Sequence, residues 1–262
     1  MVEGVATRGW AIFPPEPEVD RWAAAARAAA LARMAEPARM EAGLACEGTW
    51  FVGLDCLPND AAGQVGGVAL TGTARQAAEA IAGPLPLHPG QVSVVYPGYP
   101  RPRAGEGEGA FRYRLRRDAA HVDGLLPVGE ARRRMLRERH AYILGLPLTE
   151  ADDRAAPLVV WEGSHRILRR AFAEALGGVA PEDWADVDLS DAYHAARREV
   201  FERCARVPLV APPGAAILVH RHALHGVAPW QEGAQAPSEG RMVAYFRPEF
   251  PDPVRRDWLD AP

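Results

Sequence analysis

Four side chains in this sequence have types and spacing suited to metal-dependent chemistry. His121 and Asp123 lie two positions apart in Asp118-Ala-Ala-His-Val-Asp-Gly, and on an extended segment two such side chains point to the same face. His225 follows much later, in Leu224-His-Gly, after enough chain for several strands to return beside the first. Two imidazoles and one carboxylate form the facial triad that holds Fe(II) and leaves coordination positions open for an oxidation.

The fourth residue, Arg241, opens the strand-like run Arg-Met-Val-Ala-Tyr-Phe. A planar guanidinium can donate two parallel hydrogen bonds to a carboxylate. The chain contains no lysine, so only arginine can anchor a carboxylate in this way. His-x-Asp alone is a common chance match, and a surface turn is the alternative interpretation. The order of His121, Asp123, His225 and Arg241 favours a metal site.

With these residues, the chain resembles the phytanoyl-CoA dioxygenase family of Fe(II)/2-oxoglutarate oxygenases. The resemblance lies in His121-Val-Asp123, in Trp161-Glu-Gly-Ser-His, in Pro213-Gly-Ala-Ala-Ile-Leu-Val-His followed by Leu224-His-Gly, and in Arg241. It covers roughly residues 90 to 250. The resemblance implies a mainly β fold, a double-stranded β-helix (jelly-roll, cupin-like) core with flanking α-helices.

The same resemblance implies a set of ligands and a reaction. Iron would be held by His121, Asp123 and His225, and 2-oxoglutarate would be anchored through its far carboxylate by Arg241. The family couples O2 and 2-oxoglutarate, which is converted to succinate and CO2, to oxidation of a substrate C–H bond. Because Asp123 is present, hydroxylation of a small molecule is favoured over halogenation. The family spans many substrates, so substrate identity is left open.

Two alternatives use another set of histidines. His220, His222 and His225 follow the apolar run 215–219, and Gly214 with His220-Arg-His222 matches the start of a cupin metal motif. The glutamate expected shortly after His222 is replaced by Gly226-Val. A cupin-type metalloenzyme and a non-catalytic β-barrel binding protein are the alternative functions. If His225 binds iron, His220 and His222 are interpreted as structural, second-layer or substrate-facing groups.

Composition predicts a cytoplasmic enzyme with one domain. At 262 residues and 48% hydrophobic content the chain can bury a full core. A net charge of −4 favours neither nucleic acid nor an anionic membrane as partner. The three cysteines are scattered and indicate reduced thiols. We expect no signal peptide and no membrane span, and the sequence leaves the oligomeric state undetermined.

The periodicity predicts the elements that must position the four residues. Residues 1–45 are expected to form a helical N-terminal support, with its clearest helix over 19–34. The β-helix core is expected over 90–250, with a helical insertion over 166–206. Ser164 is expected to cap that insertion's first helix. Further strands are expected at 49–54, 91–96, 140–148 and 157–161, and a helix at 73–82.

Two basic segments flank the His-x-Asp motif. Phe111-Arg-Tyr-Arg-Leu-Arg alternates with a period of two, which predicts a strand with Arg112, Arg114 and Arg116 on one face. That row is interpreted either as a solvated edge strand or as a surface that meets an anionic substrate near the iron. Residues 129–139 are expected to form a short basic helix or lid.

Overall fold

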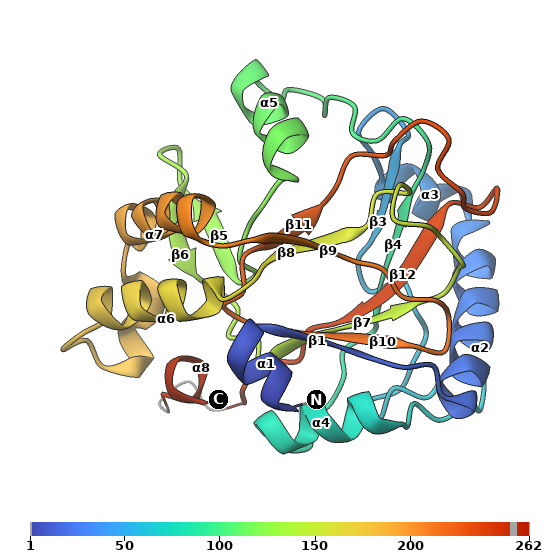
Figure 1. Ribbon diagram of the computed structural model, residues 1–262, viewed down its shortest axis with the longest axis horizontal. Helices are drawn as coiled ribbons and strands as arrows, with labels where there is room; N and C mark the ends of the chain where they lie inside the picture. The colour runs from blue at the N-terminus through green and yellow to red at the C-terminus, as the bar shows by residue number, and fades with distance from the viewer. Residues whose placement is uncertain (1, 252–255, 262) are drawn as a thin grey trace.

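A large antiparallel sheet forms one wall of the molecule (Figure 1). The protein is described here by a computed structural model that covers residues 2–251 and 256–261. The sheet has seven strands in the order β1-β10-β7-β12-β4-β3-β2. In that order they are Trp10–Phe13, Ala216–His220, Tyr142–Pro147, Arg241–Phe246, Gln91–Val95, Trp50–Gly53 and Leu44–Ala45.

A small antiparallel sheet forms the opposite wall, with the order β11-β8-β9. Its strands are His225–Val227, Leu158–Trp161 and Arg206–Leu209, and an isolated bridge between His121 and His225 extends it by one position. From β7 onward the chain passes repeatedly between the two sheets: β8 and β9 are in the small sheet, β10 in the large, β11 in the small and β12 in the large. This winding is a double-stranded β-helix, so the predicted fold class is confirmed.

The space between the sheets is filled by branched aliphatic side chains. Ile143, Ile217 and Val219 of the large sheet pack against Leu158 and Val160 of the small sheet. Because side chains alternate faces along a strand, the intervening residues of the large sheet point outward and pack against helices. This alternation fixes which residues of β12 face the barrel interior: Arg241, Val243 and Tyr245.

Helices cover the outside of both sheets (Figure 1). The outer face of the large sheet shares a core with helices α2 and α4, and the small sheet shares one with α6, η1, α7 and α8. The helices are α1 Val2–Arg8, α2 Pro17–Met34, α3 Pro37–Gly43, α4 Thr73–Ala82, α5 Glu108–Arg117, α6 Ser164–Ala175, η1 Pro181–Asp186, α7 Ser190–Arg203 and α8 Asp257–Asp260. No helix of the described residues combines the length and apolar character that a membrane crossing requires.

Most of the predicted elements are present, including the helices at 19–34 and 73–82 and the strands on either side of residue 150. The helical insertion corresponds to α6, η1 and α7. The N-terminal support is not purely helical, because residues Trp10–Phe13 form β1, which pairs with β10.

The prediction of a strand at residues 111–116 is wrong, because this segment is helix α5. Alanine, leucine and arginine favour helix intrinsically, Glu108 lies in the first turn and three arginines lie in the last turn, where their charges complement the helix dipole. Glu108 and Arg112 also pair at 3.2 Å across one turn. On a helix the arginine row is divided: Arg114 is buried against Glu106, whereas Arg112 and Arg116 are exposed.

Residues 129–139, expected to form a short basic helix or lid, do not form a helix. The segment forms the hairpin β5 (Leu125–Val128) and β6 (Arg133–Leu136). Gly129 and Arg132 both adopt positive φ in the turn between the two strands, a backbone conformation that a right-handed helix cannot contain. Leu125 and Leu136 lie opposite each other and are buried, so a buried cross-strand pair fixes the hairpin beside Asp123.

Candidate metal centre

Tertiary structure brings His121 and His225 side by side. The His121 amide donates to the His225 carbonyl at 2.8 Å, and the His225 amide donates back to the His121 carbonyl at 3.0 Å. Residues that exchange both backbone hydrogen bonds are directly opposed, so their side chains lie on the same face. The two imidazole centroids are consequently 4.6 Å apart.

Both imidazoles are held in one orientation by their own backbone. Nδ1 of His121 lies 3.0 Å from the Ala119 carbonyl, and Nδ1 of His225 lies 2.9 Å from the Ala223 carbonyl. A carbonyl oxygen only accepts, so each Nδ1 carries the proton. Nε2 of each ring is thereby turned toward Asp123, the arrangement in which metal-binding histidines are usually fixed.

Asp123 completes a three-residue donor set. Its Oδ1 lies 3.1 Å from His121 Nε2, and its Oδ2 lies 3.7 Å from His225 Nε2. One donor atom from each residue falls within 4.8 Å of the others, and among the described residues only these three form such a group. Two imidazoles and one carboxylate fit Fe(II) in a facial triad. The side chain of His121 is 50% exposed, so the centre is accessible from solvent.

The Asp123 carboxyl is held in its ionised form. Burial alone would raise its pKa, but in the metal-free site the charge of His225 and the hydrogen bonds from His121 and His225, when these rings are protonated, outweigh burial and hold the pKa well below its usual range. The ligand is therefore an anion at neutral pH, as coordination of a divalent cation requires.

The loop that carries His121 is fixed by two neighbouring elements. Asp118, in the left-handed conformation at the end of α5, accepts two hydrogen bonds from Arg206, at 2.7 and 2.9 Å. The Tyr113 hydroxyl donates to the Ala120 carbonyl at 2.8 Å. These contacts tie α5 and β9 to the ligand loop.

Gly226 follows the third ligand and has no room for a side chain. A Cβ at this position would lie 2.1 Å from the Asp118 carbonyl oxygen, and that oxygen accepts the Val227 amide at 2.9 Å. Gly226 therefore permits the close approach of the two ligand segments, a physical reason for the Leu-His-Gly pattern.

We expect Gly226→Ala to separate these segments. The protein should lose about 1–3 kcal/mol of stability, measured by urea unfolding, and its Fe(II) or Co(II) affinity should fall about tenfold. Gly109→Ala is the matched control, because a Cβ there meets nothing within 4 Å and the site is helical. Equal metal affinity in the two variants would contradict this account of Gly226.

Ser164 has a different role from the one the sequence suggested. Gly163 is the N-cap of α6, and no side chain caps that helix, so the predicted Ser164 cap is wrong. The Ser164 hydroxyl instead accepts the Leu224 amide at 2.9 Å. The Trp-Glu-Gly-Ser-His turn is thus attached directly to the residue that precedes His225.

Arg241 lies inside the barrel, where no described residue forms an ion pair with it. It is 7% exposed, and its Nη1 has no hydrogen-bond partner among the described residues. With Ile217 and Val243 it lines a small cavity of about 20 Å³. A buried guanidinium without a counter-ion is costly, so the geometry favours an anionic group bound beside it.

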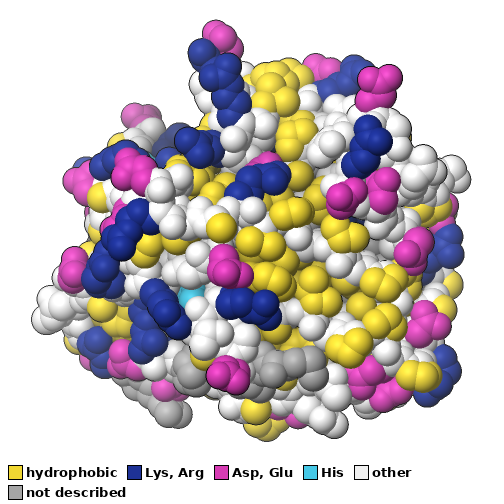
Figure 2. All heavy atoms as spheres, in the orientation of Figure 1, with side chains coloured by type: hydrophobic (Ala, Val, Ile, Leu, Met, Phe, Trp, Pro, Cys, Tyr) yellow, Lys and Arg dark blue, Asp and Glu magenta, His cyan; other side chains and the backbone are white. Residues whose placement is uncertain are grey.

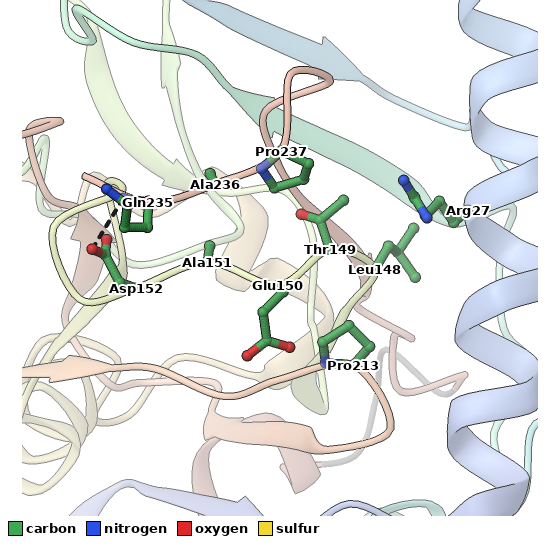
Figure 3. A pocket seen from close by; sticks show the side chains of 10 residues that line it. All are labelled: Arg27, Leu148, Thr149, Glu150, Ala151, Asp152, Pro213, Gln235, Ala236 and Pro237. Carbon is green, nitrogen blue, oxygen red and sulfur yellow. Dashed lines mark hydrogen bonds between the residues drawn. The ribbon is translucent and has the colours of Figure 1, made fainter. Parts of the chain in front are cut away.

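A larger pocket (Figure 3) adjoins the Arg241 cavity, and no residue of the triad lines it. Its volume is about 640 Å³, and it shares Thr149, Ala151 and Asp152 with the Arg241 cavity. Figure 3 shows Arg27 reaching it from α2, and Asp152 accepting a hydrogen bond from the backbone of Gln235. No group of three metal donors lies in its lining, so this pocket is distinct from the candidate centre.

His220 and His222 do not join His225. His220 contacts the ring of His165 at a centroid distance of 4.9 Å, and His222 packs edge-on against Trp258 at 4.4 Å. His222 is 0% exposed, and neither ring nitrogen has a hydrogen-bond partner in the described part of the chain. The cupin-type donor set of His220, His222 and His225 is therefore not assembled, and the substrate-facing interpretation of His220 and His222 is replaced by a packing role.

These buried histidines should make the protein sensitive to acid. Burial, and then the charge of Arg221, hold the pKa of His222 well below its usual value. The unfolded chain binds a proton near pH 6.5 while the folded ring stays neutral, so stability is lost as pH falls below about 6.5, by up to about 1.4 kcal/mol per pH unit for each such group. We expect His222→Phe to reduce this loss, measured by urea unfolding at pH 7.5 and 5.5. If the difference in unfolding free energy between pH 7.5 and 5.5 were the same in the variant and the wild type, His222 would not be the source of the acid sensitivity.

Two polar residues near Asp123, Arg247 and Gln91, were not among the site residues predicted from the sequence. Arg247 Nη1 donates to Asp123 Oδ2 at 3.3 Å, and Arg247 Nη2 donates to Gln91. The available signal was the pair Gln91 and Ser93, polar residues at alternate positions of an otherwise apolar strand. Such polar positions indicate the face of a strand that lines a site.

Comparisons with known proteins show the fold. No family model matches this sequence, and no curated protein matches it. The crystal structure of EctD from S. alaskensis in its apoform matches with a TM-score of 0.50 and 16% identity, over 99% of this chain and 84% of that chain. This chain has the EctD fold.

Two further structures are similar. EctD from S. alaskensis with bound Fe matches with a TM-score of 0.49 and 16% identity, over 99% of this chain and 82% of that chain. The non-heme alpha ketoglutarate dependent epimerase SnoN from nogalamycin biosynthesis matches with a TM-score of 0.49 and 13% identity, over 100% of this chain and 86% of that chain.

Proposed function

We propose that this protein is an Fe(II)- and 2-oxoglutarate-dependent dioxygenase that hydroxylates a C–H bond of a small molecule. The observation that carries the proposal is the convergence of His121, Asp123 and His225, with both Nδ1 atoms tied to backbone carbonyls and both Nε2 atoms turned to the carboxylate. These three residues would hold the iron. The donor set leaves coordination positions open, as oxygen chemistry requires.

Arg241 would bind the distal carboxylate of 2-oxoglutarate. Support comes from its buried Nη1, which has no hydrogen-bond partner among the described residues, and from its place on the interior face of β12. A dicarboxylate bound between the metal centre and Arg241 would neutralise the buried guanidinium and would be oriented by its fork.

The residues of the chain would then have distinct tasks in the reaction. Bound iron would supply O2 activation, by which 2-oxoglutarate and O2 give succinate, CO2 and one oxygen atom for the substrate C–H bond. Asp123 supplies the negative charge at the metal, and the two imidazoles stay neutral donors with fixed orientation. The aliphatic side chains of Ile143, Val160 and Val219 exclude water from the barrel interior between the sheets, while the metal centre is open to solvent on the His121 side.

A small molecule is the proposed substrate, and the charge distribution supports this choice over a polyanion. Figure 2 shows arginine and acidic side chains interspersed over one face of the molecule. The interpretation of Arg112, Arg114 and Arg116 as a surface for an anionic substrate loses its basis, because α5 divides the row.

We also propose that residues 1–262 act as one catalytic domain, since β1 from the N-terminal region and β12 lie in the same sheet.

The proposal is tested by titration and turnover with the purified chain. Anaerobic titration is expected to show a single Fe(II) site per chain, and 2-oxoglutarate is expected to bind only after the metal. Succinate formation, measured by chromatography during a screen of small-molecule substrates, should require added Fe(II), O2 and 2-oxoglutarate together. Failure to bind a divalent metal would favour a non-catalytic barrel instead.

A further inference from the structure

Arg247 is fixed on four sides beside the metal centre. Its Nη1 donates to Asp123 Oδ2 at 3.3 Å and its Nη2 donates to Gln91 Oε1. Its backbone amide donates to His88 Nε2 at 2.9 Å, and its carbonyl accepts from His140 Nδ1 at 2.9 Å. The Arg247 side chain is 22% exposed. Because both the side chain and the backbone of Arg247 are hydrogen-bonded, the guanidinium is held next to Asp123.

The two oxygens of Asp123 are in different environments. Oδ1 lies 3.1 Å from His121 Nε2, whereas Oδ2 lies farther from an imidazole, 3.7 Å from His225 Nε2, and receives the Arg247 hydrogen bond at 3.3 Å. A carboxylate oxygen already bound to a guanidinium has less electron density to offer a metal, and turning this oxygen away would break a charge-assisted hydrogen bond of the half-buried Arg247.

We propose that Arg247 is a positioning residue that makes Asp123 a one-oxygen ligand by retaining Oδ2. This inference rests on the proposed function. A carboxylate that bound through both oxygens would occupy one more coordination position, and that position is needed when a bidentate 2-oxo acid and O2 share the metal. Arg247 thus keeps the open face of the triad open.

Gln91 sets the direction of the Arg247 fork. It is a buried residue of β4, and its amide oxygen receives the second guanidinium nitrogen. Loss of Gln91 would leave the charge of Arg247 in place but remove one of the two points that aim it. Gln91→Leu therefore separates the effect of direction from the effect of charge.

The test uses Co(II) as a spectroscopic probe of the whole chain without co-substrate, so that turnover is not needed. Arg247→Met is expected to bind Co(II) about tenfold more tightly, because a competing cation beside Asp123 is removed and Oδ2 is freed, and to shift the visible Co(II) absorption toward a higher coordination number. Gln91→Leu should change both in the same direction by a smaller factor. Arg247→Lys keeps the charge without the fork and should be intermediate.

Arg75→Met is the matched control, because Arg75 is similarly buried but pairs with Glu79 on α4. It should leave Co(II) affinity and spectrum unchanged, and circular dichroism should show all variants folded. The inference is overturned if Arg247→Met has the wild-type affinity and spectrum, or if Arg247→Lys restores both fully. A wild-type chain that binds no Co(II) would instead refute the proposed function.

Discussion

Asp123→Ala is expected to abolish Fe(II)-dependent succinate formation and to weaken metal binding by more than about 100-fold. The reason is that Asp123 supplies the negative charge of the donor set, and the two neutral imidazoles that remain cannot compensate the charge of a divalent ion. Since changes around metal ligands alone cost about 10- to 100-fold, loss of a ligand should exceed that range. Metal affinity is measured by anaerobic titration and turnover by succinate chromatography.

Two further variants make this result specific. Asp153→Ala removes an exposed carboxyl of the loop before β8 and should change neither quantity. His220→Ala should also retain the metal, because His220 packs against His165 away from the triad. If His220→Ala lost the metal while Asp123→Ala kept it, a cupin-type centre would replace the one proposed here.

Arg241→Met is expected to remove 2-oxoglutarate binding while leaving the metal site intact. Removing one partner of a buried ion pair costs about 3–5 kcal/mol, which corresponds to a loss of roughly 10²- to 4 × 10³-fold in affinity. Methionine has similar length and no charge, so the cavity lined by Ile217 and Val243 should tolerate it. Calorimetric titration of the Fe(II)- or Co(II)-loaded chain with 2-oxoglutarate measures the effect.

The same variant should have a second, opposite effect on the free protein. Because Arg241 is buried without a partner in the described structure, replacing it with an apolar residue should raise, or leave unchanged, the thermal midpoint without ligand. The wild-type chain should gain about 2.7 kcal/mol of stability at a 2-oxoglutarate concentration of 100 times Kd, and the variant should gain none. A variant that is less stable without ligand, yet still stabilised by 2-oxoglutarate, would show that Arg241 has a structural role only.

The prediction of local structure succeeded where side-chain pattern and tertiary environment agree. The alternation and branched residues of 91–95 and 241–246 are sufficient to identify strands, since those segments lie in the middle of a sheet. At residues 111–116 the same alternation wrongly predicted a strand. No neighbouring strand pairs with this segment, so its helix propensity and the Glu108–Arg112 pair decide for a helix. At residues 129–139 a helix was predicted, but the burial of Leu125 against Leu136 across two strands decides for a hairpin.

By itself, the sequence determined the residue types of the centre and the class of fold. The candidate residues could be selected from the sequence alone, because their side-chain chemistry and their order along the chain do not depend on the fold. They are His121, Asp123, His225 and Arg241. Only the tertiary structure decided that His121 and His225 are hydrogen-bonded neighbours, that His220 and His222 belong to another cluster, and that Arg247 contacts Asp123. The physical reason is that pairing across the barrel depends on register and on which face each strand turns inward, and both are fixed by packing of the whole chain.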